Sequence, residues 1–217
     1  MNRRNVVVGT VVVALAAFAG AAAYYPSATV PAEPQEESNL VRAHSPVIGP
    51  ANAPVTIVEF LDPSCEACRA FYPIVKQIME AFPEKTRLVI RYAPLHEGSD
   101  EAVGILEAAR VQGKFEPVLE KLFFEQPKWA VHGAPDLEAA WRIAGEAGLD
   151  VEKAHGDAKA PAVVAVLNQD IADMKAINLQ GTPTFFVNGK PLTEFGPQQL
   201  YDLVAAEVKE VGDTATQ

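Results

Sequence analysis

The chain has 217 residues, of which 49% are hydrophobic, and its formal net charge at pH 7 is −10. This length suits one domain of ordinary size with a substantial core. Arg3 and Arg4 are the only charged residues among positions 1–25, so the remainder carries 16 basic and 28 acidic residues and a net charge of −12. Such an acidic chain argues against nucleic-acid binding, because that function needs a basic surface.

The N-terminus carries an export-type pattern. Arg3 and Arg4 precede an almost unbroken apolar run from Val6 to Ala23, which is typical of a signal peptide and is also about long enough to span a bilayer. We therefore expect residues 1–25 to be a signal peptide or a membrane anchor, which leaves cleavage open. A retained run would tether the protein to the membrane through residues 6–25. In both cases the remainder is expected in the periplasm or another extracytoplasmic compartment.

A linker is expected next. The segment from Tyr24 to Ser38 is rich in Pro, Ala and Glu. This composition buries too little apolar surface to offset the entropy of ordering the chain. We expect residues 26–45 to form a flexible linker.

The central motif is a strand that leads into a pair of cysteines. The apolar run from Val55 to Phe60 predicts a buried strand, which breaks at the Asp-Pro-Ser sequence of residues 62–64. Cys65 and Cys68, the only cysteines, then open a predicted helix. The free N–H groups and the dipole at a helix start stabilise a thiolate on the first cysteine, and the second lies one turn away. This pattern predicts redox chemistry rather than a structural disulfide framework.

The remaining elements divide into two sheet segments separated by helices. Residues 87–92 predict a second buried strand, and a strand–helix–strand unit implies a parallel pair. The apolar spacing over residues 99–179 is helical. Strand character resumes over residues 181–187, an Asn-Gly turn at 188–189 predicts a hairpin, and residues 198–211 predict an amphipathic helix.

With these elements in order, the chain resembles the DsbA-like branch of the thioredoxin superfamily from about Val47 to Val208. One feature is the run over residues 49–60 that leads to the sequence Cys-Glu-Ala-Cys at 65–68. Another is Pro73, five residues after the second cysteine, where the superfamily kinks its active-site helix. The third is the Gly-Thr-Pro sequence at 181–183, which is similar to the cis-proline loop of the family.

The resemblance implies an α/β fold, namely a thioredoxin fold with a helical domain inserted between its βαβ half and its ββα half. It implies that Pro183 is cis and faces the disulfide across the substrate groove. The expected parts are the N-terminal half with the two cysteines, the helical insertion, the C-terminal half with the cis-proline loop, and a frayed tail, over residues 46–98, 99–179, 180–211 and 212–217.

The expected function is extracytoplasmic thiol–disulfide exchange with protein cysteines. Cys65 would be the attacking thiol with a lowered pKa, and Cys68 the less exposed partner with a higher pKa. No cofactor is expected, because the two sulfurs carry the electrons, but a membrane or soluble redox partner must recycle them. The direction stays open between an oxidase and a reductase or isomerase.

Four further residues are candidates for supporting roles. The family carries an acidic residue at the position of Glu59, where it resembles a proton relay for the inner cysteine, and a carboxylate in an apolar strand has a raised pKa. The alternative is that Glu59 points to solvent. Thr182 offers a hydroxyl to the thiolate, which is more like the isomerase or reductase branches. Glu66 and Ala67, between the cysteines, would tune the pair and contact substrate.

Two other classes of function remain open on the sequence. Two thiolates in a Cys-x-x-Cys pattern also suit Cu(I), so the protein could be a copper carrier that uses Cys65 and Cys68. A non-catalytic binding module with this fold is the other class. No further metal site is expected, because His96, His132 and His155 are not spaced with the cysteines as a zinc site requires.

The carboxylate of Glu66 yields the first prediction. Two like charges about 4 Å apart repel by about 1 kcal/mol in water and by several times more near a protein surface. Glu66 should therefore raise the pKa of Cys65 and make the disulfide less oxidising than that of the best-known member of the branch, which has proline and histidine between its cysteines. Equilibration of wild type and Glu66→His with glutathione measures this. A histidine variant that is not the more oxidising would contradict the electrostatic argument.

Overall fold

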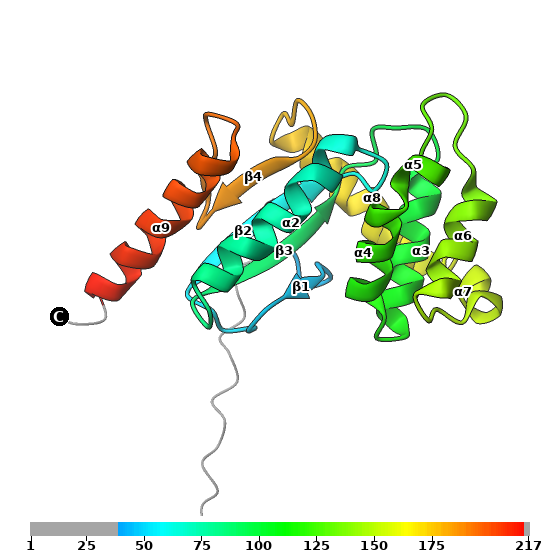
Figure 1. Ribbon diagram of the computed structural model, residues 1–217, viewed down its shortest axis with the longest axis horizontal. Coiled ribbons are helices and arrows are strands. Elements are labelled where there is room, and N and C mark those ends of the chain that lie inside the picture. Colours follow the sequence, from blue (N-terminus) through cyan, green and yellow to red (C-terminus); the bar gives the residue numbers. More distant parts are fainter. Residues whose placement is uncertain (1–38, 215–217) are drawn as a thin grey trace, which may run out of the picture. The chain divides into compact units, whose positions relative to one another are not determined.

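The structure, a computed structural model, describes residues 39–214 (Figure 1). The signal peptide or anchor predicted over residues 1–25, with its tether at 6–25, and most of the predicted linker lie outside the described residues. Within residues 39–214, no helix has both the length and the hydrophobicity that crossing a membrane requires.

A five-stranded mixed sheet forms the centre of the described chain, in the order β1-β3-β2-β4-β5. Its two long strands, β2 and β3, pair in parallel, as the strand–helix–strand pattern predicts. The other pairs, β1 with β3, β2 with β4 and β4 with β5, are antiparallel. The five strands are β1 (Val47–Ile48), β2 (Val55–Leu61), β3 (Thr86–Tyr92), β4 (Thr184–Val187) and β5 (Lys190–Pro191).

Helix α2 (Glu66–Ala81) connects the parallel strands and lies along the sheet (Figure 1). Its amphipathic face buries Phe71, Val75 and Ile78 in the main core. The ring of Phe71 lies 5.7 Å from that of Phe185 on β4, which joins the two halves of the sheet under the helix. Pro73 lies inside α2, at the position that the resemblance implies.

Six helices lie between β3 and β4 in the sequence, and most of them form a cluster beside the sheet (Figure 1). The predicted fold class, a thioredoxin fold with an inserted helical region, is confirmed. The inserted helices are α3 (Ser99–Val111), α4 (Phe115–Phe124), α5 (Gln126–Trp129), α6 (Leu137–Glu146), α7 (Val151–Asp157) and α8 (Pro161–Ala176).

The last helix of the insertion is fastened to the sheet by buried charges. Arg91 on β3 is fully buried, and its guanidinium lies 2.7 Å from Asp170 and 2.7 Å from Asp173, both on α8. Asp170 also accepts a hydrogen bond from the backbone N–H of Tyr92. Because an unpaired buried charge is strongly destabilising, this network holds α8 in one position against β3.

The C-terminal helix, α9 (Pro197–Thr214), is longer than the sequence predicts. Its last three residues, 212–214, belong to the segment expected to be a frayed tail, and residues 215–217 lie outside the described part, so the fraying stays a prediction. A glycine such as Gly212 destabilises a helix interior by only about 1 kcal/mol relative to alanine, so it does not end the helix.

Candidate active site

Cys65 lies where β2 passes into α2. The predicted helix begins at Glu66, and Cys65 is its N-cap residue, with extended backbone angles (φ −78°, ψ 122°). The side chain of Cys65 is therefore placed at the positive end of the helix dipole. Cys65 is 7% exposed and Cys68, one turn along the helix, is fully buried, so Cys65 is the more accessible of the two free thiols.

The loop before β4 faces this sulfur. The peptide bond between Thr182 and Pro183 is cis, as the resemblance implies. The thiol of Cys65 lies 3.3 Å from the backbone carbonyl oxygen of Thr182. The two segments that carry the site are 117 residues apart in the sequence, and the antiparallel pairing of β2 with β4 brings them together.

The two thiols have opposite pKa shifts. The pKa of Cys65 is lowered to about 5, first by the hydrogen bond from the thiol of Cys68, against the effect of burial, and then by the side chain of Thr182 and the backbone N–H groups of Cys68 and Ala67. The pKa of Cys68 is raised, chiefly by burial and then by the neighbouring Cys65 and Glu59. The reduced pair at neutral pH is therefore a thiolate at Cys65 beside a protonated Cys68.

Glu59 is fully buried in the middle of β2, between Ile90 on β3 and Phe185 on β4. The alternative of a solvent-facing Glu59 is wrong, because no part of its side chain is exposed. Neither carboxylate oxygen has a hydrogen-bond partner among the described residues. Burial, together with the charge of Cys65, raises the pKa of Glu59 to about 8.

Asp62 is a residue of the site that the sequence analysis missed. Its fully buried carboxylate ties the loop after β2 to the loop after β3. The only local signal was the Asp-x-Ser pattern of an Asx turn, in which the side chain accepts from the backbone two residues on. Its oxygens accept from the backbone N–H groups of Ser64, Leu95 and His96 at 2.8, 2.7 and 3.0 Å and from the hydroxyl of Ser99 at 2.5 Å, and they lie 2.7 Å from Nδ1 of His96.

The helical insertion also reaches the site. Gln126, at the start of α5, is buried and donates to the backbone carbonyl oxygens of Pro63 and Cys65 at 2.8 and 3.0 Å. These bonds hold the segment that leads into α2. Nothing local in the sequence marks Gln126, since its partners lie 61 and 63 residues away.

Glu66 lies at the rim of the site and has an ionic partner. Its carboxylate is 2.9 Å from Nε2 of His132, which comes from the loop between α5 and α6. The pKa of Glu66 is lowered, first by its own backbone N–H and then, against a small effect of burial, by His132 and His96. His132 therefore contacts the same carboxylate that was expected to oppose the Cys65 thiolate, and the effect of Glu66 on redox potential stays a prediction.

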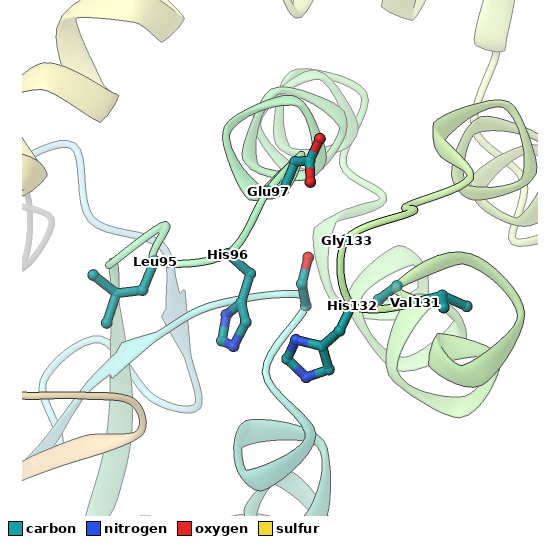
Figure 2. Close-up of a pocket in the computed structure, with 8 residues that line it drawn as sticks. Leu95, His96, Glu97, Val131, His132 and Gly133 are labelled. Carbon is teal, nitrogen blue, oxygen red and sulfur yellow. The ribbon is translucent and has the colours of Figure 1, made fainter.

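A pocket opens beside this rim. It is lined by Ser64 and by residues of the two loops that carry His96 and His132. Figure 2 shows the two imidazoles next to one another although they come from different loops, and their ring centroids are 5.2 Å apart.

A family model described as thioredoxin matches residues 42–206, which is most of the chain and all of the site. The chain belongs to the thioredoxin family. A solved structure of a thioredoxin-like oxidoreductase from Silicibacter pomeroyi is 35% identical to it, with a TM-score of 0.67, and the match covers 80% of this chain and 94% of the other. BdbD from Bacillus subtilis is 25% identical, with a TM-score of 0.68, over 76% of this chain and 93% of its own.

A solved structure with much lower sequence identity has the same fold. Alpha-DsbA1 of Wolbachia pipientis has a TM-score of 0.72 at 16% identity, with 82% of this chain and all of the other covered. The expected resemblance to DsbA-like thiol–disulfide oxidoreductases is confirmed at the level of family and fold.

Curated relatives are longer proteins. The chain is 35% identical over 144 residues to a Na(+)/H(+) antiporter NhaA of Herminiimonas arsenicoxydans, which covers 66% of this chain and 22% of the antiporter. A second antiporter of that name, from Mycolicibacterium gilvum, is 32% identical over 74% of this chain and 25% of its own length. The chain therefore spans about a quarter of the length of the curated relatives that it matches.

The contacts of the two sulfurs predict how Cys65 titrates. In the reduced protein Cys65 should ionise near pH 5, and Cys68→Ala should raise its pKa, because the strongest stabilising hydrogen bond is lost. Cys68→Ser is the matched control, since a hydroxyl keeps a donor at that position, and its effect should be smaller. Alkylation rates or thiolate absorbance against pH measure the pKa. A wild-type value close to the ordinary 9.0 would contradict the structure.

The lowered pKa of Cys65 also predicts how the stability of the reduced protein depends on pH. Because the folded-state pKa of Cys65 is lowered, the thiolate stabilises the reduced fold fully above the ordinary thiol pKa of 9.0, and this contribution is lost as the pH falls through about 5. As the pH is lowered from 9.0 to about 5, the free energy of unfolding of the reduced protein should therefore fall relative to that of the disulfide form. Chemical denaturation of both forms measures it.

Proposed function

We propose that this protein is an enzyme of thiol–disulfide exchange that acts on protein cysteines outside the cytoplasm. The observation that carries the proposal is the placement of the Cys65 sulfur at the N-terminus of α2, 3.3 Å from the carbonyl oxygen of Thr182, with Cys68 buried behind it. The extracytoplasmic location is supported by the apolar run after Arg3 and Arg4 and by the oxidising compartments in which protein disulfides persist.

In the oxidising direction, a substrate thiolate attacks the sulfur of Cys65 in the Cys65–Cys68 disulfide. The new bond forms to Cys65, the old S–S bond breaks, and Cys68 leaves and takes up a proton. A second substrate thiolate then attacks the substrate sulfur of the mixed disulfide, and Cys65 leaves as a thiolate. Two substrate thiols are oxidised to a disulfide, and the pair gains two electrons that a membrane or soluble partner must remove.

Glu59 fits the role of proton donor and acceptor for Cys68. A thiolate released at Cys68 would be buried in apolar surroundings, where burial strongly favours its protonated form. Glu59 has a pKa of about 8 and no hydrogen-bond partner among the described residues, so it holds an exchangeable proton at neutral pH. Efficient proton transfer needs such a match between the pKa of the group and the working pH.

We further propose donation of disulfides as the favoured direction. A stabilised Cys65 thiolate favours the reduced pair, and a pair whose reduced form is stabilised is a stronger oxidant. The reductase or isomerase direction is the alternative, and the identity of Thr182 favours it by resemblance. The two directions differ in whether substrate cysteines end oxidised or reduced.

An apolar surface beside Pro183 supports protein substrates. A groove runs along the cis-proline loop and is walled by Leu192 and Phe195. Phe195 is 57% exposed, and its ring lies 4.4 Å from that of Phe71 on α2. An exposed aromatic residue in the groove along the cis-proline loop fits an extended peptide segment that presents a cysteine.

The proton-relay role of Glu59 predicts a separation of activity from stability. Glu59→Gln should slow exchange by about a hundredfold, within the usual range for general acid–base catalysis. The wild-type rate of disulfide donation should fall as the pH rises through about 8, where Glu59 loses its proton, and the variant should lack this step. Stopped-flow exchange with a peptide thiol against pH measures both.

The free energy of unfolding distinguishes a catalytic role of Glu59 from a structural one. Because the buried carboxylate has no partner among the described residues, Glu59→Leu should leave the free energy of unfolding unchanged or raise it. A variant that loses stability together with activity would point to a structural role instead.

Trapping tests the proposed function directly. Cys68→Ser should accumulate mixed disulfides through Cys65 with a protein substrate that carries an accessible disulfide. The Cys65 thiolate attacks that disulfide and one substrate sulfur leaves as a thiolate, while the Cys68 sulfur that would release the adduct is missing. Cys65→Ser is the matched control and should trap nothing. Non-reducing gels show the adducts, and wild-type assays of oxidative refolding and of insulin reduction give the direction. Absence of any adduct, with Cu(I) binding to the two thiols, would favour the copper carrier.

A further inference from the structure

Three side chains from separate segments meet beside the redox pair. Glu66 begins α2, His96 lies between β3 and α3, and His132 lies between α5 and α6. One nitrogen or carboxylate oxygen of each lies within 4.8 Å of the others. The cluster consists of two imidazoles and one carboxylate. The spacing of the histidines in the sequence did not predict it, and the steps of the proposed exchange reaction do not use the two histidines.

The separations suit a small metal ion after slight adjustment. Zinc–nitrogen bonds of about 2.0–2.1 Å in a tetrahedral site place ligand atoms about 3.3 Å apart. The contact between Glu66 and Nε2 of His132 is already 2.9 Å. The side chains of Glu66 and His132 are 52% and 64% exposed, so they can turn toward His96 without disturbing the core.

His96 is held as metal-bound histidines usually are. Its Nδ1 lies 2.7 Å from the buried carboxylate of Asp62, which leaves Nε2 for another partner. A carboxylate on the second ring nitrogen fixes the ring orientation and raises the basicity of a metal ligand. Asp62 is itself fixed by hydrogen bonds from Ser64 and Ser99, so this support is rigid.

Space for a further ligand is also present. The pocket beside the cluster is lined by Ser64 and by the two histidines. Figure 2 shows the imidazoles of His96 and His132 there. A water molecule there would complete four-coordination, since open metal sites keep three protein ligands and one solvent position. The ligand types select among ions: imidazoles suit zinc and its neighbours, whereas magnesium and calcium require oxygen ligands.

We propose that Glu66, His96 and His132 form a binding site for a divalent first-row transition ion of the zinc class at the rim of the redox site. The bound ion replaces the direct contact between Glu66 and His132. It joins the start of α2 to the loops after β3 and α5. Since Glu66 adjoins Cys65, the ion also hinders approach to that sulfur, a consequence that rests on the proposed function.

The binding test uses the full chain in its disulfide form, in which the two cysteines cannot serve as thiolate ligands. Titration with Zn²⁺ by calorimetry should show one site, and Co²⁺ should produce the visible absorption of a low-symmetry complex. His96→Ala, His132→Ala and Glu66→Gln should each weaken the affinity about tenfold or more, since even supporting residues of a metal site contribute 10–100-fold.

His155→Ala is the matched control, because His155 is not part of the cluster and packs against Trp141, with ring centroids 4.1 Å apart. This variant should bind as wild type does. Because the side chain of His132 is exposed, His132→Ala should fold as wild type does, and thermal unfolding checks this. Saturable binding that each of the three variants weakens about tenfold or more supports the site. No saturable binding, or binding unchanged in His96→Ala and His132→Ala, overturns it and means that the Glu66–His132 pair is only an ion pair.

The exchange assay separates this inference from the proposed function. Metal-free protein should exchange disulfides whether or not the site exists. Zn²⁺ should slow the reaction of wild type with a peptide thiol and leave His132→Ala much less affected. Equal inhibition of both proteins would contradict the effect of the site on Cys65.

Discussion

The rest of the site depends on the hydrogen bonds to the buried carboxylate of Asp62. A charged group without contact to water must be satisfied by hydrogen bonds, and Asp62 takes its donors from the loop after β2 and from the loop after β3. The two loops are thereby fixed relative to one another. One of them sets the start of α2 and with it the position of Cys65, and the other carries His96.

The two cysteines show how one helical turn gives two identical groups different surroundings. Cys65 stands at the helix start, where hydrogen bonds and the dipole stabilise negative charge. Cys68 lies in the core, where burial opposes it. The neighbouring Glu59 is buried and unpaired among the described residues, an arrangement that lowers stability. A group retained in such a position is expected where proton transfer is needed.

The inserted helices contribute directly to the site. The last helix of the insertion, α8, is anchored to β3 by the pairing of Arg91 with Asp170 and Asp173. From the middle of the insertion, Gln126 binds the backbone around Cys65, and His132 pairs with Glu66. A substitution in the insertion can therefore alter the surroundings of Cys65 without changing either cysteine.

The sequence by itself determined the local features: the buried strand before Cys65, the cysteine pair at a helix start, the cis-proline loop by resemblance, and the order of elements. These follow from short-range spacing, which a linear pattern preserves. Only the tertiary structure decided that Glu59 is enclosed, that Asp62 and Gln126 support the loop, and that Glu66, His96 and His132 meet. These contacts join residues about 30 to 126 positions apart. No local pattern specifies which distant side chain fills a given position beside the site.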